Sequence, residues 1–222
     1  MTSLDSVKWS APKKWAIEIE IMNFWSDQMT LGVAVIGAGM AGRGHAAAYR
    51  AATSLYGSDL PEVKLVSIGD VNVGFGEAAA KRFGFQRHDT DWRTIADDPN
   101  IQAVSVVVAN SLHREIVEGL LAAGKHVLCE KPLSDTLEDA RAMVAAANAS
   151  DRIARIGLTY LRNPAIAAIH KIVSSGQLGK VLHFTGNYWA DYSCDPKAPI
   201  SWRYKGGMGT GALADVGSHI SY

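Results

Sequence analysis

The segment from Val33 to Gly42 constrains the fold of this 222-residue chain more than any other part of the sequence. It reads Val-Ala-Val-Ile-Gly-Ala-Gly-Met-Ala-Gly, so an apolar run passes directly into a glycine-rich turn. A run of small residues follows at 46–49 and is typical of a helix. A strand, a glycine turn and a helix in this order indicate a unit that binds a dinucleotide.

Three glycines and one methionine of this turn are predicted to contact the cofactor. We expect Gly37 to allow the tight turn and Gly39 to let the backbone approach the pyrophosphate. Gly42 would let the helix pack closely against the strand, and Met40 lies between the last two glycines. The pyrophosphate would bind to the unpaired N–H groups at the N-terminus of the helix.

Strands and helices alternate along the chain after this turn. The predicted strands and helices are strands 63–68, 103–108, 126–129 and 153–157, and helices 76–83, 112–123 and one capped by Ser134 or Asp135 that ends at Ala149. Glu138 offers a capping-box carboxylate to the last of these helices. Because the strands are apolar throughout, the pattern predicts an α/β fold with a Rossmann-type, doubly wound parallel sheet.

The alternation of strands and helices stops after about residue 160, where we expect an incomplete α+β second domain. Its predicted parts are a helix at 164–173, a turn at Gly176 and Gly179, an antiparallel strand at 181–189 and a helix from about Ala212. One strand and two helices cannot close a domain, because an unpaired strand leaves its backbone groups open.

Three regions are therefore predicted along the chain. Residues 1–28 form an extension outside the fold, 29–158 the cofactor domain, and 159–222 the start of a truncated substrate or oligomerisation domain. Residues 17–21 alternate between apolar and acidic side chains, so an added edge strand is the alternative for the extension.

Charge and composition exclude several classes of function. Lys plus Arg and Asp plus Glu both number 22, so no basic surface for nucleic acid is expected. No apolar run approaches the ~20 residues of a membrane span. The two cysteines, Cys129 and Cys194, form neither a disulfide framework nor a zinc pattern, and no metal site is predicted. This cysteine usage favours a reducing, cytoplasmic location.

Asp70 ends the second predicted strand, and Asn72 lies close by. A carboxylate at this place accepts both hydroxyls of the adenosine ribose and repels the 2′-phosphate of NADP. Asp70 follows Gly37 by 33 residues, more than the usual ~20, and an insertion at 53–61 accounts for the excess. Asp70 thus predicts NAD rather than NADP, with a surface-turn aspartate as the alternative. Asn72 could assist either cofactor.

Polar side chains follow two further strands, at the sheet edge where ligands bind in such folds. Asn110 and His113 follow the strand at 103–108, and Glu130 and Lys131 follow the strand at 126–129. We expect Asn110 on the nicotinamide side, and His113 either at the cofactor or only packed at a helix start. A lysine beside a cofactor can polarise a substrate oxygen or hold the nicotinamide ribose. The following Pro132 could form a cis peptide bond.

Asp215 and His219 lie four residues apart and so on one face of the last predicted helix. A histidine with a pKa near neutrality suits proton removal from a carbinol. The aspartate could orient the histidine or bind a substrate hydroxyl. A solvated pair on a helix surface is the alternative.

Together these motifs resemble the glucose–fructose oxidoreductase, inositol dehydrogenase and rhizopine-catabolism family (Gfo/Idh/MocA). The resemblance runs from about Leu31 to the C-terminus, and its most specific segments are 33–39, 123–132, 160–164, 176–181 and 211–219. It implies a two-domain NAD(P)-dependent oxidoreductase that transfers a hydride between a nicotinamide cofactor and a sugar, inositol or related polyol.

The resemblance also implies roles for individual residues. His219 would be the base and Lys131 would assist it, with Asp215 completing the catalytic set. The residues expected near the substrate are these three with Tyr160, Arg162 and Trp202. Trp202 could equally be a packing anchor.

Members of the family continue through an open β-sheet that often forms the oligomer interface, so a homo-oligomer is expected for the complete protein. The alternative to an enzyme is a catalytically inactive nucleotide-binding fragment or an NAD(P)-sensing regulator on the same fold.

Overall fold

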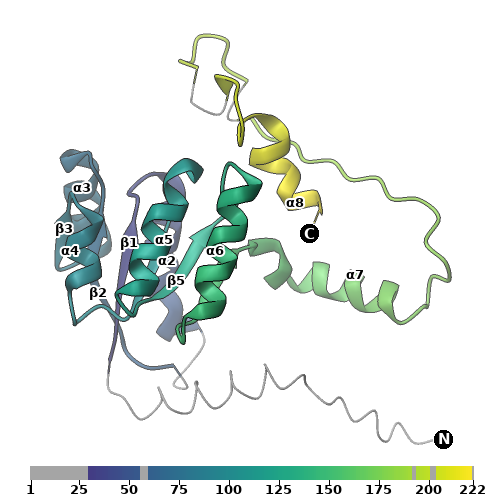
Figure 1. Cartoon of the computed structure of the whole chain (residues 1–222). Helices are drawn as coiled ribbons and strands as arrows, with labels where there is room; N and C mark the ends of the chain where they lie inside the picture. The colour runs from purple at the N-terminus through teal and green to yellow at the C-terminus, as the bar shows by residue number, and fades with distance from the viewer. Residues whose placement is uncertain (1–29, 56–59, 192–193, 201–203, 222) are drawn as a thin grey trace, which may run out of the picture.

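The computed structural model describes residues 30–55, 60–191, 194–200 and 204–221. A six-stranded sheet occupies the centre of the molecule in the order β3-β2-β1-β4-β5-β6, and every neighbouring pair is parallel (Figure 1). This arrangement confirms the Rossmann-type sheet predicted from the sequence. The strands are β1 (Leu31–Ile36), β2 (Val63–Gly69), β3 (Arg87–Asp89), β4 (Ala103–Val106), β5 (His126–Glu130) and β6 (Ala154–Gly157).

Helices connect the strands and continue beyond the sheet. They are α2 (Met40–Leu55), α3 (Val73–Phe83), α4 (Trp92–Asp97), α5 (His113–Ala122), α6 (Leu137–Ala149), α7 (Pro164–Ser174) and α8 (Ser218–Ser221). Short 3₁₀ turns lie at Asn110–Leu112 and Thr159–Arg162, and a π-helical turn at Leu213–Gly217 leads into α8.

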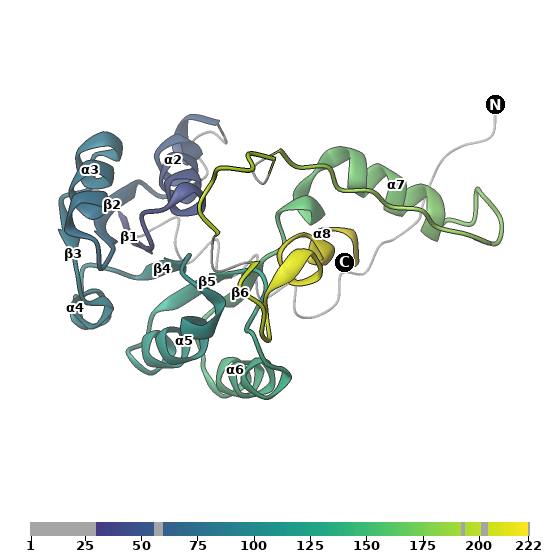
Figure 2. The same cartoon turned by 90° about the horizontal axis from the view of Figure 1, so that it is seen from above.

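Helices cover the sheet on both faces. Figure 2 shows α2 and α3 on one face and α4, α5 and α6 on the other. Side chains alternate along β1, so Val33 and Val35 pack in the core beside α2 and α3, whereas Ala34 and Ile36 pack in the opposite core. All four are at most 5 % exposed. A strand that is buried on both faces is apolar at every position, which explains the continuous apolar run.

Short elements depart from the sequence prediction. The prediction missed β3 and α4, because segments of three and six residues are too short to show a periodicity. The expected cap of α6 at Ser134 or Asp135 is wrong. Thr136 is the N-cap, and its hydroxyl accepts the backbone N–H of Asp139 at 3.0 Å. Asp139 therefore stands at the position that Glu138 was expected to fill.

The predicted strand at 181–189 is also wrong, because these residues run as irregular chain without ladder partners in the described structure. In Figure 1 the chain rises from the end of α7 and runs back toward α8. The expectations for residues 1–28, including the alternating stretch at 17–21, lie outside the described residues.

The helix α7 is apolar on one side and projects from the sheet (Figure 1). Asn163 caps it through the backbone N–H of Ala165, and Pro164 stands at its first position, where the missing N–H costs nothing. Its side chains Ile166, Ile169 and Ile172 are 40 %, 56 % and 39 % exposed. None of the helices described here has the length and apolarity to cross a bilayer.

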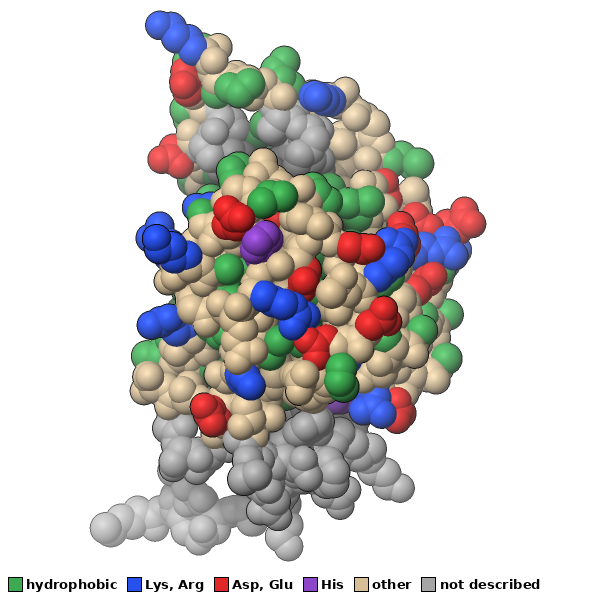
Figure 3. Space-filling model, turned by 90° about the vertical axis from the view of Figure 1, so that its left-hand side faces the viewer, with side chains coloured by type: hydrophobic (Ala, Val, Ile, Leu, Met, Phe, Trp, Pro, Cys, Tyr) green, Lys and Arg blue, Asp and Glu red, His purple; other side chains and the backbone are tan. Residues whose placement is uncertain are grey.

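The surface around α3, β3 and α4 carries charges of both signs. Lys and Arg alternate there with Asp and Glu, and no field of one sign dominates this face (Figure 3). This pattern agrees with the balanced composition.

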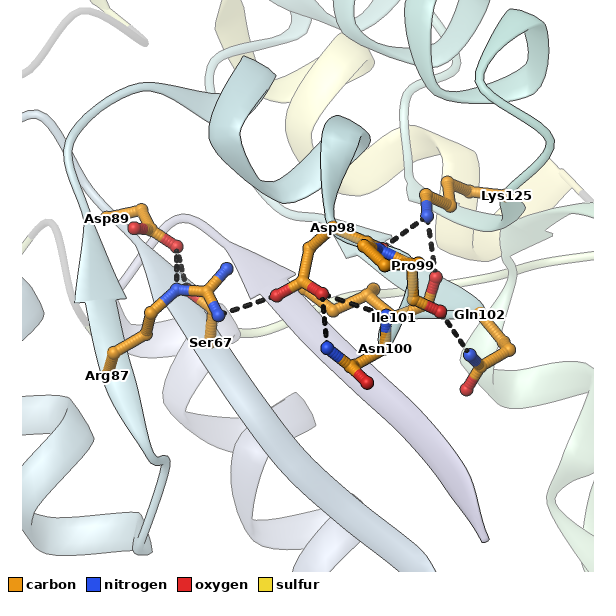
Figure 4. A network of polar contacts seen from close by, with 9 residues as sticks. All are labelled: Ser67, Arg87, Asp89, Asp98, Pro99, Asn100, Ile101, Gln102 and Lys125. Atoms are coloured by element: carbon orange, nitrogen blue, oxygen red, sulfur yellow. Dashed lines mark hydrogen bonds and ion pairs between the residues drawn. The ribbon is translucent and has the colours of Figure 1, made fainter.

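A polar network lies where the chain enters β4 and β5 (Figure 4). Asp98 accepts from Arg87 Nη1 at 2.6 Å and from the backbone N–H of Asn100 at 2.8 Å. The ammonium group of Lys125, a residue only 6 % exposed, donates to the carbonyl oxygens of Asp98 and Ile101. The network ties the loop before β4 to both β3 and β5.

We expect Asp98→Asn to destabilise the fold by roughly 1–3 kcal/mol at pH 7, because two charge-assisted hydrogen bonds weaken. Burial alone would raise the pKa of Asp98, but the N–H of Asn100 and the guanidinium of Arg87 lower it below its ordinary value. The carboxylate therefore stabilises the fold above the pKa of the unfolded chain, and this contribution is lost as the pH falls through the lower, folded-state pKa.

The measurement is urea unfolding at a series of pH values from 7 down to the acid limit. As the pH falls, the free energy of unfolding should decrease less in Asp98→Asn than in the wild type. In Asp97→Asn, which changes the neighbouring exposed residue, it should decrease as much as in the wild type. The same acid decline in Asp98→Asn and in the wild type would contradict the role given to Asp98.

Candidate functional site

The glycine turn joins β1 to α2 at the carboxyl edge of the sheet. Gly37 has a φ of 107°, which favours glycine, and its N–H donates to the carbonyl oxygen of Gly69 at 2.6 Å. A Cβ at Gly42 would lie 1.7 Å from the carbonyl oxygen of Gly37. The close approach of turn and helix therefore requires glycine at position 42, and the atom that a Cβ would meet belongs to the turn rather than to the strand.

Asp70 lies beside this turn, directly after β2. Its Oδ2 accepts the backbone N–H of Ala38 at 2.8 Å, and its Oδ1 accepts the N–H of Asn72 at 2.8 Å. Asn72 caps α3 by accepting the N–H of Phe75 at 3.1 Å. Asp70 thus holds the two loops together, and its carboxylate stands where the ribose of a dinucleotide would be expected.

The residues around the turn fit a dinucleotide. A Cβ at Gly39 would meet nothing within 4 Å, so the space in front of the turn is open. The first-turn N–H groups of α2 have no partner further back in the helix and suit a pyrophosphate. A cavity of about 480 Å³ adjoins the turn, and it is lined by Ala38, Gly39, Met40, Arg43, Phe75, Arg82 and Phe83.

Lys131 follows β5 at the same edge, and its peptide bond to Pro132 is cis. Its Nζ donates to the carbonyl oxygen of Asp215 at 2.6 Å and lies 3.5 Å from the carboxylate Oδ1 of the same residue. The side chains of Lys131 and Asp215 are 15 % and 16 % exposed. A cavity of about 80 Å³ lies here, and it is lined by Ala41, Val107, Asn110, Glu130, Lys131, Pro132 and Asp215.

His219 lies beside these residues, between two tyrosines. Its ring packs edge-on against Tyr160 at 4.9 Å and stacks on Tyr188 at 5.5 Å, both measured between ring centroids. Burial, followed by the charge of Lys131, lowers the pKa of His219, although Glu130 and Asp215 oppose the shift. The imidazole is therefore neutral at pH 7 and able to accept a proton.

Asn110 and His113 occupy different positions at the end of β4. Asn110 lines the smaller cavity and donates through Nδ2 to the carbonyl oxygen of Gly209 at 2.9 Å. His113 is 1 % exposed, and its Nδ1 lies 3.1 Å from each of the carbonyl oxygens of Pro132 and Leu133. In this structure His113 packs behind the turn that carries Lys131, which is the second of the two positions considered for it.

The remaining predicted residues are spread more widely. Arg162 lies exposed in the 3₁₀ turn with Tyr160, and Trp202 falls outside the described residues. Within the described ranges, no group of three His, Cys, Asp or Glu side chains is placed to hold a metal ion.

Sequence reasoning missed His45, which contacts Glu130, and Tyr188, which stacks on His219. A histidine within a helix of small residues was the one visible sign of the first. Tyr188 carried no sign, because it was assigned to a strand.

Comparison with known proteins identifies two matching family profiles. Residues 31–158 match the Gfo/Idh/MocA oxidoreductase family, NAD-binding Rossmann fold. Residues 166–221 match the Gfo/Idh/MocA C-terminal domain.

Curated relatives match over most of this chain. A levoglucosan dehydrogenase of Pseudarthrobacter phenanthrenivorans is 38 % identical over 86 % of this chain and 49 % of its own length. A scyllo-inositol 2-dehydrogenase (NAD(+)) of Bacillus subtilis is 29 % identical over 68 % of this chain and 43 % of its own. The chain thus spans about half the length of the curated relatives that it matches.

A solved structure of levoglucosan dehydrogenase in complex with NADH and levoglucosan has a similar fold. It superposes with a TM-score of 0.79 at 36 % identity, over 86 % of this chain and 52 % of that chain.

Proposed function

The chain belongs to the Gfo/Idh/MocA oxidoreductase family and carries its NAD-binding Rossmann fold, and from this premise we propose that it acts as a sugar or polyol dehydrogenase. The reaction is the oxidation of a secondary alcohol to a ketone, or its reverse. When bound, NAD supplies the hydride acceptor at its nicotinamide ring. The remaining chemistry falls to the side chains at the carboxyl edge of the sheet.

Three side chains divide this work in the proposal. His219, neutral at pH 7, accepts the proton of the substrate hydroxyl. Lys131 donates a hydrogen bond to the substrate oxygen, and Asp215 holds the lysine ammonium in place. Tyr160 packs against His219 and lines the approach to it.

One observation carries the proposal. Lys131 at the end of β5 meets Asp215, 84 residues later in the chain, in a small cavity that also reaches Ala41 at the start of the dinucleotide helix α2. A reacting carbon held there would lie near both the cofactor turn and the charged pair, and such positioning is a large part of dehydrogenase catalysis.

The test begins with the purified chain. NADH binding is measured by fluorescence titration, and reduction of NAD⁺ is then followed with levoglucosan, L-sorbose and inositols as candidate substrates. Binding together with turnover of one of these supports the proposal. Binding without turnover on any sugar or polyol favours the nucleotide-binding fragment or sensor. The absence of NADH binding contradicts both.

Asp70→Ala is expected to lower the preference for NADH over NADPH about tenfold, which corresponds to ~1.4 kcal/mol. The carboxylate accepts ribose hydroxyls and repels a 2′-phosphate, so its loss penalises NADH more than NADPH. Because Asp70 also accepts the N–H of Ala38, some affinity for both cofactors should be lost.

The Kd values for both nucleotides give the preference as a ratio. Asp70→Asn serves as the matched variant, because an amide oxygen can still accept the N–H of Ala38 while the negative charge is gone. An unchanged ratio in both variants would refute the ribose role.

A further inference from the structure

A hydrogen-bonded chain of side chains joins the dinucleotide helix α2 to the residue that precedes Lys131. His45 Nε2 lies 3.0 Å from Glu130 Oε1, and the two side chains are only 17 % and 16 % exposed. The contact joins residues 85 positions apart in the sequence. It connects the element that carries the glycine turn directly to the end of β5.

The imidazole of His45 is held at both nitrogens. Its Nδ1 lies 3.1 Å from Ser105 Oγ, and Ser105, which is fully buried in β4, also contacts the hydroxyl of Tyr49 at 2.9 Å. Burial raises the pKa of Tyr49, against the opposing effect of Ser105, so the phenol keeps its proton. With a neutral imidazole, each proton of this network has an acceptor. The Tyr49 hydroxyl donates to Ser105 Oγ, the Ser105 hydroxyl donates to His45 Nδ1, and His45 Nε2–H donates to Glu130 Oε1.

The carboxylate of Glu130 is fixed from three directions. Its Oε1 accepts from His45, and its Oε2 accepts the backbone N–H of Lys131 at 3.0 Å. A Cβ at Gly157 in β6 would lie 2.7 Å from Oε1, so the neighbouring strand closes the third side. Burial raises the pKa of Glu130, but the hydrogen bonds from His45 and from the backbone N–H of Lys131 and the charge of Lys131 lower it overall. Glu130 is therefore a carboxylate at neutral pH.

We propose that His45 is a positioning residue. From its place on α2 it holds the carboxylate of Glu130, and this carboxylate in turn holds the backbone and the ammonium of Lys131 in place. This inference rests on the proposed function of Lys131. Without the imidazole, Glu130 keeps its charge and loses the partner that turns it away from the lysine. The carboxylate then pairs with the Lys131 ammonium and competes with the substrate oxygen for it.

The test compares three variants of the full chain. His45→Asn keeps an acceptor near Ser105 but cannot reach Glu130, whereas His45→Gln places an N–H donor where Nε2 stands. Tyr49→Phe removes the other contact to Ser105 and leaves Glu130 untouched. The first readout, which needs no turnover, is competitive acetylation of Lys131 relative to the exposed Lys64, mapped by peptide mass spectrometry.

In His45→Asn, we expect the acetylation of Lys131 relative to Lys64 to fall about threefold, because a new ion pair shields the amine. NADH Kd should change less than about threefold, and kcat should fall about tenfold with KM unchanged, because the lysine is misplaced rather than the cofactor. His45→Gln should restore most of both losses, and Tyr49→Phe should match the wild type.

Two results would overturn the proposal. His45→Asn could match the wild type in both acetylation and kcat, or His45→Gln could be as impaired as His45→Asn, which would indicate a packing role only. If His45→Asn fails to fold, Glu130→Gln replaces it. Its single amide oxygen cannot accept both from His45 Nε2–H and from the Lys131 N–H, so kcat should fall, and the acetylation of Lys131 should rise because the negative charge is gone. Wild-type values of both in Glu130→Gln would equally overturn the proposal.

The outcome separates this inference from the proposed function. If the wild type oxidises no sugar or polyol but the acetylation of Lys131 responds as expected, the link through Glu130 stands and the dehydrogenase proposal fails. If the wild type turns over and the variants equal it in every readout, the function stands and the link fails.

Discussion

Lys131→Ala is expected to lower sugar or polyol turnover by roughly 10²–10⁴-fold, the usual range for a group that assists proton transfer. The affinity for NADH should fall much less, because the predicted contacts to the pyrophosphate and the adenosine ribose, the glycine turn and Asp70, follow the other strands β1 and β2. The lysine Nζ stands 2.6 Å from the carbonyl oxygen of Asp215 in a small cavity, which places its charge at the proposed reacting oxygen. Steady-state kinetics together with NADH titration separate the two effects.

Lys64→Ala on β2 is the matched control, since it removes an equal charge from an exposed position. Wild-type turnover in Lys131→Ala would remove Lys131 from the mechanism. Equal losses of turnover and of NADH affinity would instead assign the lysine to the nicotinamide ribose, the other role that the sequence left open.

Gly42→Ala is expected to destabilise the fold by about 3 kcal/mol or more and to abolish measurable NADH binding. The added Cβ would lie 1.7 Å from the carbonyl oxygen of Gly37 and 2.8 Å from its carbonyl carbon. These are backbone atoms, and the N–H of Gly37 is itself bonded to Gly69, so the turn cannot move aside without breaking its link to β2. Thermal unfolding and NADH titration measure the two consequences.

Two other glycines of the same segment provide controls. A Cβ at either Gly39 or Gly44 meets nothing within 4 Å. Gly39→Ala should therefore fold normally and bind NADH weakly, because its Cβ enters the space expected for the pyrophosphate. Gly44→Ala should bind normally and gain roughly 0.5–1 kcal/mol, because alanine is the better residue in a helix. Normal stability and binding in Gly42→Ala would refute the close packing of turn and helix.

Long apolar elements were predictable from the sequence, and short or context-dependent ones were not. The strands β1, β2 and β4 are apolar enough to predict burial on both faces, and successive residues of each are buried. The alternation at 181–189 resembled a strand, but a strand forms only where a neighbour completes its hydrogen bonds, and the described chain offers none there. The three-residue β3 exists through pairing with β2, which no local pattern records.

Only part of the candidate site was predictable, for a similar reason. Lys131 and Asp70 follow apolar strands, so their place at the carboxyl edge followed from the topology. The contact between His45 and Glu130 joins α2 to the end of β5, and the histidine within a helix of small residues does not by itself indicate this partner. Tyr188 reaches His219 through irregular chain, where sequence periodicity predicts nothing.

The exposed isoleucines of α7 also affect how the isolated chain behaves in solution. An exposed apolar stripe of this kind promotes non-specific association between molecules as the concentration rises. The chain should therefore self-associate as its concentration rises, and light scattering should report a growing mean mass. Dilute samples are the ones in which an NADH titration describes a single molecule.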